Sequence, residues 1–138
     1  MANKADQLIY RLPSGWVFLC GMQFLSGYCI LHADPEVPSL NDLPPDMRQI
    51  FLTDMALVGD AILAVTGAER INYALMGNSD PVLHAHIVPR YAWEPEELRK
   101  GLPWSHPNAY DASTAFNPDR DRELMDALQQ AILARQDK

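Results

Sequence analysis

The sequence predicts an α+β protein in which an antiparallel sheet packs against one long helix, with a further helix near the C-terminal end. Three observations predict this class. Short apolar runs rich in β-branched and aromatic residues occur twice before residue 32 and twice after residue 70. A segment with helical periodicity lies between the two pairs of runs. A second helical segment follows residue 117.

The first two strands are predicted near the N-terminus. Residues 16–19 and 27–31 are apolar, and the short connection between them is typical of neighbouring strands. Residues 1–7 are polar, and we expect them to be flexible. The stretch 33–45 contains four prolines and predicts a surface loop that leads into a helix beginning near Pro45.

The central helix is predicted over residues 46–66. Apolar residues recur there at steps of three and four, which gives the segment one apolar face. Gly67 follows directly and is a candidate C-cap, since glycine readily adopts the left-handed conformation that ends many helices.

The second half of the chain predicts a hairpin followed by a long loop. Residues 71–76 and 82–91 read as strands joined by a Gly-Asn-Ser-Asp-Pro turn at 77–81. Residues 92–116 lack a period and predict mostly loop, with a short helical turn at 96–100. Asn117-Pro118 predicts the N-terminus of the last helix. We expect residues 1–138 to form a single domain.

Charge and composition restrict the classes of partner. The formal net charge of −7 over 138 residues opposes binding to nucleic acid or to an anionic membrane. Neither an export signal nor a membrane span is indicated, so we expect a cytoplasmic protein. Cys20 and Cys29 have apolar neighbours and no metal-ligand spacing, which predicts reduced core thiols.

Two histidines stand on one face of the predicted strand 82–91. Strand alternation places His84 and His86 on the same side as Val82 and Val88, while the other side is apolar and suits the long helix. Imidazole titrates near neutral pH, and its neutral form is a competent nucleophile toward phosphorus. The strand is therefore predicted to be half core and half reactive site.

The run Val82-x-His84-x-His86-x-Val88 resembles the signature of the histidine-triad superfamily, in particular its bacterial branch similar to diadenosine polyphosphate hydrolases. This resemblance implies attack by His84 on the α-phosphate of a nucleotide, through a nucleotidyl-histidine intermediate. It also implies that the backbone carbonyl of Val82 accepts the other ring proton.

The resemblance implies further roles around the phosphate. It assigns His86, Asn78 and Ser79 as donors to the charged oxygens, and Asn72 as a residue that helps to place the phosphate or ribose. The substrate would be a dinucleoside polyphosphate or a nucleotidyl conjugate. No cofactor is required, although a divalent cation can accompany a polyphosphate. The implied assembly is a homodimer.

The sequence departs from the family pattern at two places. Val82 replaces the first histidine of the triad, and losing one well-placed donor costs about 3 kcal/mol, or roughly a hundredfold in rate. Upstream, Glu36 stands where many members carry a histidine, and the sequence leaves open whether His32 substitutes.

Other readings of the motif remain open at the level of sequence. The chain could be a nucleotide-binding module with weakened or absent turnover, or a protein that binds a metal through His84 and His86. Arg90 fits a solvated ion pair better than a phosphate contact. Trp93 and Trp104 fit loop packing or a subunit contact better than stacking on a base.

Overall fold

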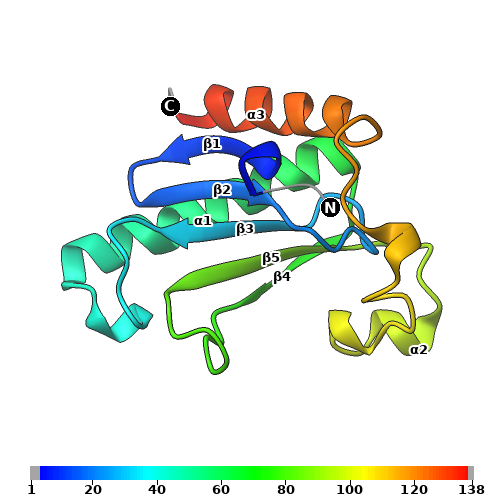
Figure 1. Cartoon of the computed structure of the whole chain (residues 1–138), viewed down its shortest axis with the longest axis horizontal. Coiled ribbons are helices and arrows are strands. Elements are labelled where there is room, and N and C mark those ends of the chain that lie inside the picture. The colour runs from blue at the N-terminus through cyan, green and yellow to red at the C-terminus, as the bar shows by residue number, and fades with distance from the viewer. Residues whose placement is uncertain (1–3, 137–138) are drawn as a thin grey trace.

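The computed structural model describes residues 4–136 and contains one five-stranded sheet with two long helices (Figure 1). The strands are β1 (Leu8–Leu12), β2 (Gly15–Leu19), β3 (Cys29–Ala33), β4 (Arg70–Ala74) and β5 (His84–Arg90). The α-helices are α1 (Pro45–Thr66), α2 (Glu96–Arg99) and α3 (Arg122–Gln136). Short 3-10 helices lie at Lys4–Gln7, Leu40–Asp42, Pro103–Ser105 and Ala112–Thr114.

Every pair of neighbouring strands in the sheet is antiparallel, and the strand order is β1-β2-β3-β5-β4. The predicted hairpin is present as β4 and β5. β5 lies in the interior of the sheet, between β3 and β4, and β4 forms one edge of the sheet. This order brings the two histidines of β5 beside β3, with His84 opposite His32 and His86 opposite Ile30.

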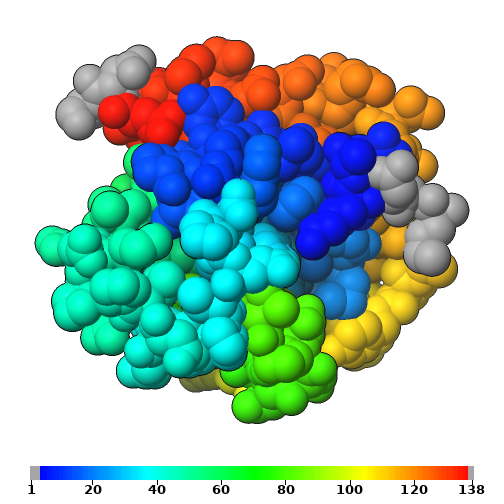
Figure 2. All heavy atoms as spheres, turned by 60° about the vertical axis from the view of Figure 1, so that its left-hand side comes forward, coloured from blue at the N-terminus to red at the C-terminus, as the bar shows by residue number. Residues whose placement is uncertain are grey.

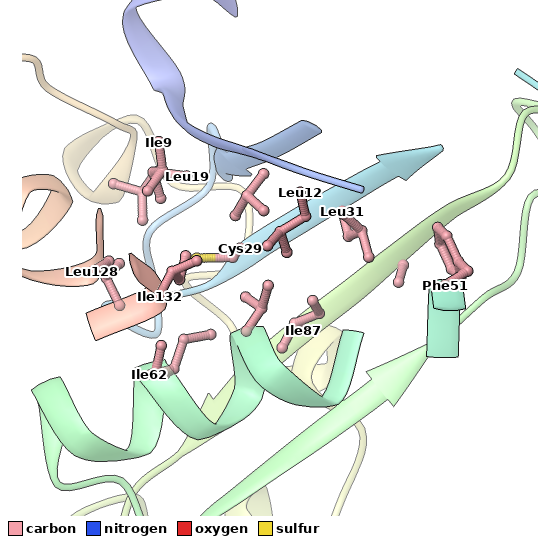
Figure 3. Packing of buried hydrophobic residues seen from close by; sticks show 14 of the residues in the cluster. Ile9, Leu12, Leu19, Cys29, Leu31, Phe51, Ile62, Ile87, Leu128 and Ile132 are labelled. Carbon is pink, nitrogen blue, oxygen red and sulfur yellow. The ribbon is translucent and has the colours of Figure 1, made fainter. Parts of the chain in front are cut away.

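The core lies between one face of the sheet and the two long helices (Figure 3). Alternate residues of each central strand point into it, including Leu31 of β3 and Ile87 of β5. From the helices, Phe51 and Ile62 of α1 and Leu128 of α3 are completely buried against this face. The opposite face of β5 carries His84 and His86, both partly buried, followed by the buried Val88 and Arg90.

Helix α1 begins and ends as the sequence predicts. Pro45 occupies its first turn, and Gly67 caps its end with a φ of 71°. Within residues 4–136 it is also the one helix whose length and composition would suit a membrane span, with a mean hydropathy of 1.5. Here it lies across the sheet, and one face of it, including Phe51, Val58 and Ile62, packs in the core, while Met47 and Ile50 are exposed (Figure 1).

Several predicted boundaries were wrong. β1 was not predicted; its register with β2 shifts between Leu8 and Tyr10, and its buried residues Ile9 and Leu12 are three positions apart, so they break the strict alternation. Residues 4–7 of the segment predicted to be flexible form a 3-10 helix, and 1–3 lie outside the described residues. Each hairpin strand is shorter than predicted, because the residues of the connection, 75–83, are not paired in the sheet.

The last helix begins four residues later than predicted. Asn117 does cap a helical turn, since its side chain accepts hydrogen bonds from the backbone N–H groups of Asp119 and Arg120. The Asn117 N–H in turn donates to the carboxylate of Asp121, at 2.9 Å. This turn precedes the continuous helix, which starts at Arg122. The prediction of a cap at Asn117 was therefore sound, and the regular helix is shorter.

The long segment 92–116 is folded back onto the outer face of the sheet. Its end pairs with the connection between β2 and β3, where the Gln23 N–H donates to Thr114 and the Phe116 N–H donates to Gly21. Together these segments cover a second apolar cluster, which includes Phe24, Tyr28 and Val88. The cluster covers the C-terminal part of β5 and stops at His86.

Candidate functional site

His84 is held by its neighbouring backbone. Its Nδ1 lies 2.6 Å from the carbonyl oxygen of Val82. A carbonyl oxygen can only accept, so Nδ1 carries the proton and Nε2 keeps a free lone pair. This is the hydrogen bond that the family resemblance implies, and it does not depend on the side chain at position 82.

The peptide group that orients His84 is itself fixed. The carbonyl of Val82 and the N–H of Leu83 belong to one peptide, and that N–H donates to Val37, at 2.7 Å. Figure 2 shows the segment after β3, in cyan, against the green connection between β4 and β5. The loop after β3 therefore positions His84 through the Val82-Leu83 peptide.

His86 has a different partner. Its Nδ1 lies 2.6 Å from the hydroxyl oxygen of Tyr28, a side chain that is fully buried at the entrance to β3. The ring of Trp104 meets the His86 ring edge-on, with centroids 5.3 Å apart. His84 and His86 are neighbours, with ring centroids 4.9 Å apart and planes inclined by 71°.

Burial and the neighbouring His84 lower the pKa of His86 to about 4. The ring is therefore neutral at physiological pH. Burial is also the main cause that raises the pKa of Tyr28, so its phenol stays protonated. The pair therefore consists of a neutral imidazole and a neutral phenol, and each group can both donate and accept a hydrogen bond.

The far end of β5 holds a buried polar cluster. Arg90 forms an ion pair with Glu94 at 2.9 Å, and both side chains are almost completely buried. His106 contacts the same carboxylate through Nε2, at 2.6 Å. Burial alone would raise the pKa of Glu94, but hydrogen bonds from Arg90, the Tyr91 N–H and His106 hold it below its usual value. Arg90 thus forms an ion pair, as the sequence favoured, but the pair is buried and not solvated.

The remaining predicted site residues lie on β4 and in the connection between β4 and β5. Asn72 of β4 shares the face of His86, yet its Oδ1 accepts from Arg90 at 2.8 Å. Asn78 and Ser79 are exposed in the connection before β5. The structure shows no hydrogen bond from either residue to His84 or His86.

His32 is the polar residue of β3 nearest to the motif. It lies opposite His84 in the sheet and on the same face, and its Nε2 is 2.8 Å from Glu36. Glu36, the upstream residue at which the sequence departs from the family pattern, is thus hydrogen-bonded to His32, whose possible substitution the sequence left open. Together with His84 and His86 they extend a row of polar side chains across β3 and β5.

A cavity of about 600 Å³ opens between β4 and residues 100–104. Asn72 and Ala74 lie on its β4 side, and Trp104 lies on the other. Ala74 is the register partner of His86, so the cavity adjoins the histidine pair. Within residues 4–136 there is no group of three or more histidine, cysteine or acidic side chains that could hold a metal ion.

The arrangement matches solved structures of histidine-triad proteins. A histidine-triad protein from Sinorhizobium meliloti aligns with a TM-score of 0.73 and 21% identity, over 90% of this chain and 87% of that one. One from Marinobacter aquaeolei aligns at 0.75 and 19%, over 95% and 93%. A hypothetical histidine triad nucleotide-binding protein from Sulfolobus tokodaii aligns at 0.70 and 15%, over 93% and 84%.

The chain therefore has the histidine-triad fold, and both the predicted α+β class and the predicted fold family are confirmed at the level of structure. No family model matches the sequence, and no curated protein matches it.

Sequence reasoning missed two residues of the site, Tyr28 and Trp104. Tyr28 was placed in a predicted strand, and alternation puts it on one face with His32. That β3 pairs with β5 cannot be read from the spacing of the strands. Trp104 was read as loop packing; it does pack, but one of its contacts is His86.

Proposed function

We propose that this protein is a nucleotide hydrolase or nucleotidyl transferase that attacks the α-phosphate of its substrate with Nε2 of His84. The observation that supports the proposal most directly is the hydrogen bond from Nδ1 of His84 to the carbonyl of Val82, at 2.6 Å. It leaves a nucleophilic lone pair on Nε2 and provides an acceptor that stabilises the positive charge developing on the ring.

The reaction proceeds in two displacements at phosphorus. Nε2 of His84 forms a bond to the α-phosphorus while the bond to the leaving oxygen or nitrogen breaks, which gives a nucleotidyl-histidine. Water then attacks the same phosphorus and releases the nucleoside monophosphate and His84. Negative charge on the phosphoryl oxygens is greatest during attack, so a donor nearby, His86, acts in both steps.

The substrate class follows from the resemblance and from the space beside the pair. Dinucleoside polyphosphates and nucleotidyl conjugates each join a nucleotide to a bulky leaving group. The cavity between β4 and Trp104 can receive one of these groups, with Asn72 on its wall. Asn78 and Ser79 lie on the exposed connection before β5, and the proposal keeps them as donors to the bound phosphate.

Val82 raises the alternative of a nucleotide-binding module without turnover. A module without turnover would bind nucleotides in the same place, because binding needs donors and space but no free lone pair on His84. The hydrogen bond at Val82 favours the enzyme, since the backbone carbonyl still orients His84 although the valine side chain cannot replace the missing donor. A metal-binding function has less support, because within the described residues His84 and His86 belong to no group of three or more side chains that could hold a metal ion.

The test is release of AMP from diadenosine polyphosphates and from adenylated amines, measured for the wild type and for His84→Ala. We expect the wild type to release AMP and His84→Ala to release none. With the amine conjugates, release by the wild type should not require a metal ion. His32→Ala is the matched control, since this histidine lies opposite His84 but its Nε2 is bonded to Glu36. If calorimetry shows nucleotide binding but neither the wild type nor a variant releases AMP, the result would instead support the binding module.

We keep a homodimer in the proposal. β4 is an edge strand whose backbone has one free side, and Tyr73 on it is exposed. α1 also presents apolar side chains outward, including Met47 and Ile50. Light scattering of the purified protein tests the dimer, and a cytoplasmic location remains a prediction from the sequence.

A further inference from the structure

We propose that Tyr28 is a positioning residue that holds His86 as the tautomer with its proton on Nε2. The two histidines of β5 then present opposite groups to a substrate: an acceptor nitrogen from His84 and a donor N–H from His86. The tautomer is a property of the folded chain. Its consequence for turnover rests on the proposed function.

The geometry gives the two rings opposite partners. Nδ1 of His84 faces a carbonyl oxygen, which can only accept. Nδ1 of His86 faces a phenol, which can donate, at 2.6 Å. Tyr28 reaches this position because it directly precedes β3 and is completely buried in the outer apolar cluster.

The direction of the hydrogen bond follows from the surroundings of the phenol. Were Nδ1 of His86 to donate, the buried hydroxyl proton of Tyr28 would need another acceptor. The thiol of Cys20 also interacts with this hydroxyl, but sulfur is a weak acceptor. The indole of Trp104, which also acts on the phenol, can only donate. An imidazole nitrogen is therefore the best acceptor for the Tyr28 proton.

The chemical consequence lies at the phosphate. With its proton on Nε2, His86 offers an N–H to a phosphoryl oxygen while remaining neutral. The other tautomer would direct a lone pair at that oxygen and repel it. Trp104, packed edge-on against the His86 ring, restrains the plane in which the N–H points. Tyr28 thus selects the donor that the α-phosphate requires, without touching the substrate.

The first experiment reads the tautomer directly. In long-range ¹H–¹⁵N spectra of the wild type we expect Nδ1 of His86 to show an acceptor-type nitrogen shift and Nε2 a protonated one. In Tyr28→Phe we expect both shifts to move toward averaged values. Tyr91→Phe is the matched control, because Tyr91 donates to the carbonyl of Ser26 and does not hydrogen-bond to either histidine. A protonated Nδ1 in the wild type overturns the proposal.

The second experiment measures turnover of the same variants. Loss of part of one donor's effect predicts a kcat about tenfold lower for Tyr28→Phe, with KM changed less than about threefold, and near-normal values for Tyr91→Phe. A shifted tautomer with unchanged kcat contradicts the catalytic consequence. If no substrate is turned over by the wild type, the proposed function fails, while the spectra still decide the tautomer. If Tyr28→Phe does not fold, the wild-type spectrum alone decides it.

Discussion

The two ends of β5 use polar side chains in opposite ways. At the Arg90 end, each guanidinium nitrogen donates to a protein oxygen, from Glu94, Asn72 or a backbone carbonyl. At the other end, His84 and His86 each engage Nδ1 with the protein, and the structure shows no hydrogen bond to either Nε2. The side chains at one end are hydrogen-bonded within the protein, whereas the other end leaves two ring nitrogens without a hydrogen bond to the protein.

Substitution of His84 is the strongest way to separate the two ends. We expect His84→Ala to lower kcat/KM on the order of a thousandfold or more, because the nucleophile is lost. Its free energy of unfolding should change by less than about 1 kcal/mol, since the ring is only partly buried. Steady-state kinetics measure the loss of kcat/KM, and urea unfolding measures the stability. A large loss of stability would contradict the assignment of a structural role to the Arg90 end alone.

Glu94→Gln should have the converse effect. It leaves the charge of Arg90 buried without its partner, and we expect the free energy of unfolding to fall by about 3 kcal/mol. Glu96→Gln is the matched control: its ion pair with Lys100 is largely exposed and is worth less than about 0.5 kcal/mol. Equal losses from the two variants, measured by denaturant unfolding, would show that the buried cluster is not a structural anchor.

Stability should also depend on pH through His86. Its pKa is lowered from 6.5 to about 4, so between these values the unfolded chain binds more protons than the folded one. We therefore expect the contribution of His86 to be fully present above pH 6.5 and to be lost as pH falls toward 4. His86→Gln should flatten this part of the unfolding free energy. If the pH dependence of the unfolding free energy is the same in His86→Gln, another group is responsible for it.

The smallest effect is expected at Val82. Val82→Ala removes the side chain but keeps the carbonyl that orients His84. We predict a kcat within about threefold of the wild type, as for most substitutions away from buried polar groups. A loss of a hundredfold would mean that the valine side chain, and not its carbonyl, positions the nucleophile.

The sequence predicted those parts of the molecule that depend on local pattern. Helical spacing and Gly67 defined α1, and alternation placed His84 and His86 on one face. The register shift in β1 interrupts the alternation of buried and exposed residues, and this strand was not predicted. The contact of Tyr28 with His86 joins residues 58 positions apart, so it depends on the order of strands in the sheet. Long-range pairing of this kind leaves no trace in the spacing of a single sequence.

The most direct test of the account is to trap the covalent intermediate. The protein is mixed with an adenylated amine or diadenosine polyphosphate, quenched within one turnover and analysed by intact mass and peptide mapping. The account predicts a mass increase of one adenylyl group on the wild type, located on His84, and no adduct on His84→Ala. AMP release that persists in His84→Ala, with no adduct on the wild type, would contradict it.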